Sequence, residues 1–223
     1  MLAPREKLWP ASLPIVQKAL SLLNLTPADR LADYGCGNGI ALFTAIEEFH
    51  ISHAYGYEIY LPRAQELIKE IQDKQLEHKI TIKIQNALDA SPIEPTAVYL
   101  YLISRGLGMI LPLLRTIAKH QPNKKLRVVT VLYKIPNVAY DKVEKVYTSD
   151  IAMTPIYLYT ITPDSGLDTN TIMNNSSSDI NTTTGNNISI PSETISISSS
   201  NVINTNNDNI NDNTITPTDG NSI

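Results

Sequence analysis

The chain has 223 residues, and its 18 Lys and Arg against 22 Asp and Glu give a formal net charge of −4. Its single cysteine, Cys36, excludes an internal disulfide and a zinc site built from cysteines. No apolar run approaches the roughly 18 residues of a membrane-spanning helix, so we expect no span. The 4 histidines are scattered at the ends of the expected elements, and we expect no metal site.

The predicted elements begin with a helix and a strand. Residues 13–23 carry apolar side chains at helical spacing, and Pro14 suits a first helical turn. Residues 30–34 (Arg-Leu-Ala-Asp-Tyr) predict a strand, and a second helical pattern covers about residues 38–50. A strand, a short connection and a helix in this order form the entry to a parallel βαβ unit.

The connection between that strand and that helix is rich in glycine. Asp33 is followed by a turn in which glycine alternates with other residues, and its candidate ligand-binding members are Gly35, Gly37, Asn38 and Gly39. Glycine adopts positive φ and lets a ligand approach the main chain closely. A dinucleotide-binding turn would have its third glycine at position 40, where this chain has Ile40. An acid followed by G-x-G-x-G instead resembles the turn of class I S-adenosylmethionine (SAM) methyltransferases.

A second acidic residue stands at the end of the next predicted strand. Residues 54–58 form a short strand pattern that ends in Glu58. This acid follows the glycine turn by roughly 20 residues, the separation expected in a nucleotide-binding βαβ unit. A carboxylate at this position can accept hydrogen bonds from both ribose hydroxyls of a nucleoside.

Polar residues also follow the third predicted strand. A helical pattern at residues 62–75 leads to strand-like residues 79–85. The segment after this strand contributes three candidate residues, Asn86, Ala87 and Asp89. In the methyltransferase fold that the glycine turn resembles, this segment lies beside the adenine ring, where Asp or Asn can bond the exocyclic amine.

The second half of the chain continues with two strands and a helix. Residues 97–103 predict a buried strand, and residues 126–132 predict the next one. The helix between them, at residues 107–120, must tolerate Pro112, so we expect a kink or a late start there.

The pattern then ends in two strand-like runs with no helix between them. Residues 143–151 and 156–161 predict an antiparallel hairpin joined by residues 152–155. A dehydrogenase domain would continue with another helical crossover. We therefore predict an α/β fold with a Rossmann-like, mostly parallel seven-stranded sheet that closes with a C-terminal antiparallel hairpin.

The composition changes abruptly at residue 164. Residues 164–223 are rich in Asn, Ser, Thr and Ile, contain no Lys, Arg, His or aromatic residue, and hold 7 of the 22 acids. Such a segment cannot bury enough apolar surface to offset its chain entropy. We therefore predict one folded domain over residues 1–163 and a disordered tail over residues 164–223. The predicted domain carries a net charge of +3, which does not indicate a nucleic-acid partner.

Five short motifs in chain order resemble a narrower family. They are residues 9–12 (Trp-Pro-Ala-Ser), 33–39, 56–59 (Gly-Tyr-Glu-Ile), 98–102 (Val-Tyr-Leu-Tyr-Leu) and 157–159 (Tyr-Leu-Tyr). Together they resemble the small lysine methyltransferases that include the mitochondrial enzymes for the ATP synthase c subunit and the adenine nucleotide translocase. The resemblance covers roughly residues 8–162. Two positions depart from it, because this chain has Asn38 where the family tends to have Asp and Ser104 where it tends to have Pro.

The resemblance implies an enzyme, a cofactor and an acceptor. The cofactor is SAM, bound by the glycine-turn and strand-end residues named above. The acceptor is an accessible lysine on a protein partner, and the residues implied near the transferred methyl group are Tyr99, Tyr101 and Ser104. A tyrosine ring face can hold a methylammonium group by cation–π attraction. The resemblance implies a mitochondrial location, but no targeting segment is evident, so a cytoplasmic location is the alternative.

Two other functions remain open at this point. One is a small-molecule O- or N-methyltransferase, which would bind the same cofactor. The other is a non-catalytic binding protein that has kept the fold. Asp33, the three glycines and Glu58 are all present together, which favours an enzyme over the second alternative.

Overall fold

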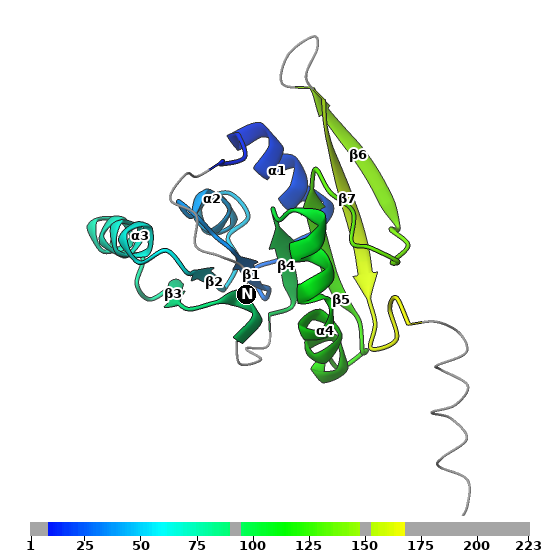
Figure 1. The fold of residues 1–223 in the computed structure, drawn as a ribbon. Helices are drawn as coiled ribbons and strands as arrows, with labels where there is room; N and C mark the ends of the chain where they lie inside the picture. Colours follow the sequence, from blue (N-terminus) through cyan, green and yellow to red (C-terminus); the bar gives the residue numbers. More distant parts are fainter. Residues whose placement is uncertain (1–8, 90–94, 148–152, 168–223) are drawn as a thin grey trace, which may run out of the picture. The chain divides into compact units, whose positions relative to one another are not determined.

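The computed structural model describes residues 9–89, 95–147 and 153–167. Within them, the chain forms a seven-stranded sheet with the strand order β3-β2-β1-β4-β5-β7-β6 (Figure 1). The strands are β1 (Arg30–Tyr34), β2 (His53–Glu58), β3 (Ile80–Ile84), β4 (Ala97–Leu100), β5 (Leu126–Val131), β6 (Lys142–Tyr147) and β7 (Met153–Ile161). The helices are α1 (Leu13–Leu22), α2 (Ile40–Glu47), α3 (Leu61–Asp73) and α4 (Ser104–His120), with a short 3-10 helix at Ala87–Asp89.

The direction of the strands confirms the predicted fold class. Strands β1 to β5 pair in parallel, whereas β7 is antiparallel to both β5 and β6. The sheet is therefore mostly parallel and closes with a C-terminal antiparallel hairpin. No helix in the described ranges is long and apolar enough to cross a membrane.

The central strands β1, β4 and β5 are buried on both faces, as strands of parallel sheets usually are. Successive residues of a strand point to opposite faces, and in β1 the side chain of Leu31 belongs to one buried cluster and that of Ala32 to the other. The first cluster includes apolar residues of α1, α2 and α3, and the second includes those of α4. This packing fixes the strand ends, and with them the residues that follow each strand.

Several element boundaries differ from the prediction. Helix α2 begins at Ile40 because Gly39 has a left-handed backbone with φ of 76°. Strand β4 ends at Leu100, where the chain leaves the sheet, and α4 begins at Ser104 rather than at residue 107. Pro112 lies inside α4, so the late start does not occur.

The predicted hairpin connection at residues 152–155 is wrong in part. Met153 to Pro155 belong to β7, and Pro155 pairs with Lys145 of β6. The Pro155 carbonyl accepts a hydrogen bond from the Leu132 N–H at 2.8 Å, just beyond the end of β5. Pro155 is tolerated because β5 has ended there and no ladder partner needs its missing N–H. Residues 148–152 lie outside the described residues, as does the tail beyond Leu167, so the predicted disorder of the tail stays a prediction.

Candidate functional site

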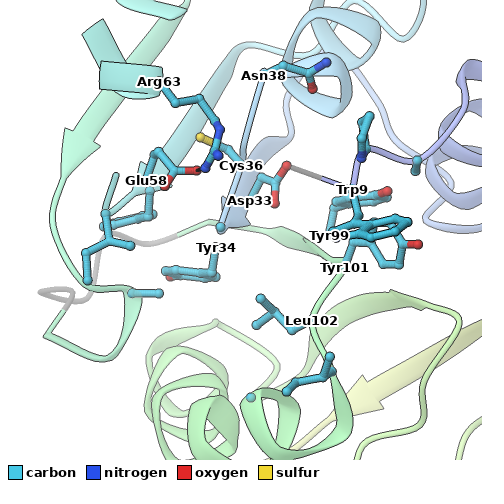
Figure 2. Close-up of a pocket in the computed structure, with 18 of the residues that line it drawn as sticks. Trp9, Asp33, Tyr34, Cys36, Asn38, Glu58, Arg63, Tyr99, Tyr101 and Leu102 are labelled. Carbon is cyan, nitrogen blue, oxygen red and sulfur yellow. Dashed lines mark ion pairs between the residues drawn. The ribbon is translucent and has the colours of Figure 1, made fainter. Parts of the chain in front are cut away.

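A cavity of about 650 Å³ lies at the carboxyl ends of the parallel strands, where α/β folds usually bind their ligands. It is lined by the segment before α1, by residues at the ends of β1 to β5, and by the first turns of α4 (Figure 2). Eight of the predicted site residues line it: Asp33, Gly35, Asn38, Glu58, Asn86, Ala87, Tyr99 and Tyr101. Four do not: Gly37, Gly39, Asp89 and Ser104.

The glycine turn is fastened to the neighbouring strand. The backbone N–H groups of Gly35 and Cys36 both donate hydrogen bonds to the Tyr57 carbonyl, at 2.8 and 3.0 Å. Gly35 has φ of 94°, and a Cβ atom built there would lie 3.2 Å from Leu102. Gly35 therefore keeps the main chain open to the cavity, as the sequence predicts for a ligand-binding turn.

Gly39 has a different role, because it lets two helices approach each other. A Cβ atom built on Gly39 would lie 2.5 Å from the side chain of Leu67 in α3. The neighbouring Asn38 is exposed at the cavity, and its side-chain oxygen accepts a 3.4 Å hydrogen bond from the Ile40 N–H. Gly39 is thus a packing residue of the α2–α3 contact, and Asn38 borders the cavity at the start of α2.

The carboxylate of Glu58 is fixed in place by three groups of its own chain. Its Oε1 accepts a hydrogen bond from the Tyr60 N–H at 2.8 Å, and its Oε2 accepts one from the Gly37 N–H at 3.1 Å. Arg63, on the first turn of α3, lies 3.3 Å from Oε2 as an ion pair. Glu58 is only 5% exposed, and its Oε1, which accepts only the Tyr60 bond among the described residues, keeps a lone pair for a ligand.

Asp33 lies beside Glu58 in the strand order but has no partner of its own. It stands opposite Gly56 of β2 and Tyr99 of β4, and it is 3% exposed. Its carboxyl group makes no hydrogen bond or ion pair with the residues that the structure describes. Burial, together with the nearby Glu58 carboxylate, raises the pKa of Asp33 to about 8. A buried polar group without a partner is rare in folded proteins and indicates a place for a ligand.

Two tyrosine hydroxyls that border the cavity are also buried without a hydrogen-bond partner in the described ranges. Tyr99 projects on the same side of the sheet as Asp33, and burial raises its pKa well above the usual range. Tyr34 projects to the α4 side and stacks on Tyr57 with ring centroids 4.7 Å apart. The inner cavity therefore combines apolar walls with polar groups that lack partners.

The outer part of the cavity is aromatic and open. Trp9 is 67% exposed, Tyr133 is 39% exposed, and Tyr101 is half-buried between the interior and the rim. Figure 2 places Trp9, Tyr99 and Tyr101 on one side of the cavity, across from Glu58 and Arg63. We refer to Trp9, Tyr101 and Tyr133 as the aromatic rim.

Sequence reasoning missed Arg63 and Tyr133 as site residues, and it named Trp9 only as part of a family motif. Arg63 looks like any polar residue on the first turn of a predicted helix, and Tyr133 looks like any residue after a strand. The remaining predicted residues lie near the cavity without lining it. Ser104 is the first residue of α4, and Asp89 is exposed at the end of the 3-10 helix. In the described part of the chain, no three His, Cys, Asp or Glu side chains gather as a metal site would require.

The chain is similar to several known methyltransferases. No family model matches the chain. A protein-lysine N-methyltransferase of Saccharolobus islandicus (strain REY15A) is 27% identical over 158 residues, which cover 71% of this chain and 95% of that protein. The chain is also similar to a solved RNA methyltransferase from Salinibacter ruber in complex with S-adenosyl-L-homocysteine, with a TM-score of 0.63, 21% identity, and coverage of 72% of this chain and 98% of that one.

A second similar structure is the magnesium protoporphyrin IX methyltransferase of Synechocystis PCC 6803 with bound SAM, at a TM-score of 0.52 and 13% identity, covering 67% of this chain and 79% of that one. SAM, the cofactor predicted from the sequence, is thus found in one of these two structures and its demethylated product in the other. The chain has the fold of the class I SAM-dependent methyltransferases.

Proposed function

We propose that the chain is a SAM-dependent N-methyltransferase whose acceptor is a lysine amine on a protein. One observation carries this proposal: a single cavity joins two buried carboxyl groups, those of Asp33 and Glu58, to an open aromatic rim. The carboxyl side suits a nucleoside that carries a cationic amino acid group. The rim suits an amine that arrives from solution on a larger molecule.

The polar groups of the inner cavity are of the kinds that SAM requires. Glu58 is oriented by backbone N–H groups and retains acceptor capacity for the ribose hydroxyls. The unpaired carboxyl group of Asp33 is suited to a cationic amino group, since charge-assisted hydrogen bonds are the strongest of their kind. We assign Asn86 and Ala87, which line the same cavity, to the adenine ring.

For methyl transfer, the main task of the protein is to align the acceptor amine with the methyl group. When bound, SAM supplies a methyl group that its sulfonium already activates. The chain has to place the amine in line with that methyl group, and we assign this to Tyr99 and Tyr101 at the end of β4. A lysine amine is mostly protonated at neutral pH, so it must first lose a proton. The open rim lets water receive that proton.

Two observations favour lysine over other acceptors. The relative from Saccharolobus is named as a protein-lysine methyltransferase, and the alignment spans 95% of it. The Gly-Tyr-Glu and Tyr-Leu-Tyr-Leu motifs also resemble the lysine methyltransferases of the ATP synthase c subunit and the adenine nucleotide translocase. Because the neighbours of known structure include RNA and small-molecule methyltransferases, those acceptors are the alternatives that an experiment has to separate.

The test has two stages. Calorimetry first measures binding of SAM and of S-adenosylhomocysteine to the purified chain. The chain is then incubated with SAM that carries a deuterated methyl group and with separate protein, RNA and metabolite fractions of a lysate. The proposal expects the label on lysine residues of proteins, located by mass spectrometry of peptides. Label confined to RNA or to metabolites would reject the lysine acceptor, and absence of SAM binding would reject the enzyme.

A further inference from the structure

We propose that the aromatic rim, Trp9, Tyr101 and Tyr133, acts as an acceptor wall. The wall selects a cationic amine through contact with the faces of the aromatic rings. This inference rests on the proposed function, since it concerns the acceptor side of the same cavity. It adds two residues, Trp9 and Tyr133, whose ring faces do the selecting. The chemistry that it assigns to the acceptor is a positively charged alkylammonium group, in contrast to a neutral hydroxyl or a nucleobase.

The three rings come from separate segments of the chain and line one cavity. Trp9 belongs to the segment before α1, Tyr101 follows β4, and Tyr133 follows β5, and all three line the same cavity. The hydroxyl of Tyr133 lies close enough to Tyr101 to raise the pKa of Tyr101 further, after the larger effect of burial. Large aromatic side chains that stay exposed around one opening indicate a recognition surface more strongly than isolated ones do.

The position of Tyr133 is enforced by an unusual backbone. Leu132 has φ of 71°, a left-handed conformation that a residue with a bulky side chain rarely adopts. The segment is held from several sides: the Tyr133 N–H donates to the Val131 carbonyl at 2.9 Å, and the Thr130 hydroxyl donates to the Tyr133 carbonyl at 2.7 Å. The Ile135 N–H donates to the Tyr159 hydroxyl at 3.0 Å.

Backbone strain of this kind persists only where the surroundings over-determine it, and it is concentrated at functional sites. Here the strain at Leu132 turns the chain sharply at the end of β5 and brings Tyr133 to the cavity opening. The backbone at Tyr133 is therefore held by hydrogen bonds of the chain itself.

The charges around the cavity favour ring faces over a salt bridge on the acceptor side. Among the described residues that line it, Asp33 and Glu58 are the acids, and both are buried. Of the two lining arginines, Arg63 is paired with Glu58, and Arg105 is exposed on the first turn of α4. An ammonium group at the rim would thus be held by aromatic faces, which attract cations through their negative π surfaces.

The aromatic ring faces that would bind the amine would also favour the methyl transfer. The amine first gives its proton to water, and its lone pair then forms the N–C bond while the C–S bond breaks and its electron pair passes to sulfur. The product nitrogen is a methylammonium, so positive charge builds on nitrogen during the transfer. Ring faces stabilise this developing charge without having to accept a proton.

Trp9 offers a direct readout because it is the only tryptophan of the chain. Its fluorescence can be titrated with choline and, separately, with the neutral isostere in which a tert-butyl group replaces the trimethylammonium group. The two probes have the same shape and differ in charge. We expect choline to change the fluorescence of Trp9 at a concentration about fivefold or more below that needed for the isostere. Equal responses, or no response to either probe, would overturn the acceptor wall.

Variants test the same idea through kinetics. Tyr133→Leu removes the ring and keeps apolar bulk, whereas Tyr133→Phe removes only the hydroxyl. We expect the acceptor KM of Tyr133→Leu to exceed that of Tyr133→Phe by about fivefold or more, while the SAM Kd stays the same in both. Trp9→Leu and Trp9→Phe should differ in the same direction. Tyr147→Leu is the matched control, because Tyr147 is 69% exposed on β6 and does not line the cavity.

The lysine reaction and the acceptor wall can be rejected separately. If choline binds selectively but no protein lysine is methylated, the acceptor wall stands and the proposed lysine reaction is wrong. If lysine is methylated but the Leu and Phe variants at positions 9 and 133 have equal acceptor KM, the reaction stands and the acceptor wall is wrong. A SAM Kd that changes together with the acceptor KM would mean that the rings support the fold of the whole cavity, and it would also overturn the wall.

Discussion

Asp33 and Tyr99 stand directly opposite each other on the paired parallel strands β1 and β4, and the Tyr99 hydroxyl is buried without a hydrogen-bond partner among the described residues. Both residues are 3% exposed. Burying a carboxyl group and a hydroxyl group without partners opposes folding. This cost is consistent with the proposed role of the pair as a binding surface.

Replacement of Asp33 should change how the free energy of unfolding depends on pH. The folded-state pKa of Asp33 is raised from 3.8 to about 8, so the folded chain holds a proton that the unfolded chain releases. The resulting stability is fully present below about pH 4 and is lost as the pH rises through about 8. Urea unfolding should show a free energy of unfolding that falls by more than about 1 kcal/mol over this range. In Asp33→Asn this fall should disappear.

The same variant should lose cofactor affinity. A cationic group beside Asp33 favours the ionised carboxylate, so SAM affinity of the unmodified chain should rise with pH up to about 8. Calorimetry with Asp33→Asn should give weaker binding without this rise. A variant that binds SAM as tightly as the unmodified chain would remove Asp33 from the site.

Glu58 is expected to hold the cofactor through its charge. Glu58→Gln keeps the size of the side chain but removes the charge, and Glu58→Ala removes both. Loss of a charge-assisted pair of hydrogen bonds costs about 1.5–3 kcal/mol, so both variants should bind SAM roughly tenfold more weakly or worse. Thermal unfolding should confirm that Glu58→Gln still folds, because Glu58 also accepts the Gly37 and Tyr60 N–H bonds. Unchanged affinity in a folded variant would contradict the assignment.

Gly39 should be intolerant of a side chain for two separable reasons. Gly39→Ala forces an alanine into φ of 76° and places its Cβ atom 2.5 Å from Leu67. We expect a loss of more than about 1 kcal/mol in the free energy of unfolding, measured by denaturant titration. Adding Leu67→Ala removes the collision but not the backbone strain, so Gly39→Ala should cost less in that background. If it costs the same, the collision contributes nothing.

Truncated chains test the position of the domain boundary. A chain that ends at Leu167 should unfold cooperatively and bind SAM, because the predicted domain ends close to that residue. Ending the chain at Thr162 removes Ser165, whose carbonyl accepts a 2.7 Å hydrogen bond from Arg115 and whose hydroxyl accepts a 2.8 Å hydrogen bond from the Thr162 N–H. That shorter chain should be less stable by about 1 kcal/mol per lost bond. Failure of the longer truncation to fold would place the boundary further along the chain.

Much of the fold was predictable from local patterns. The glycine turn and Glu58 are signals within one βαβ unit, where short-range spacing reflects strand and helix lengths directly. The acids at the ends of β1 and β2 therefore lie where the sequence predicts. Strand boundaries were less predictable, and Pro155 is the clearest case, since it lies within β7 but beyond the end of β5, where its missing N–H costs no ladder bond.

The acceptor side could not be predicted in the same way. Tyr133 reaches the cavity because Leu132 adopts a left-handed backbone, and that conformation depends on hydrogen bonds to β7 and on the end of β5. Arg63 is joined to Glu58 only after α3 has packed on the sheet. Such contacts form only in the tertiary structure, and no local sequence pattern near these residues predicts them.

The strand order has a consequence for how this site can change. The chain winds outward from β1 in two directions, towards β2 and β3 on one side and towards β4 and β5 on the other. Connections that depart to opposite sides leave a crevice between β1 and β4 without removing any core side chain. The opening is thus a product of topology, and its rim residues belong to segments outside the strands and helices that pack the core. Acceptor preference in such a protein can diverge by exchange of rim residues while the packed sheet keeps its stability.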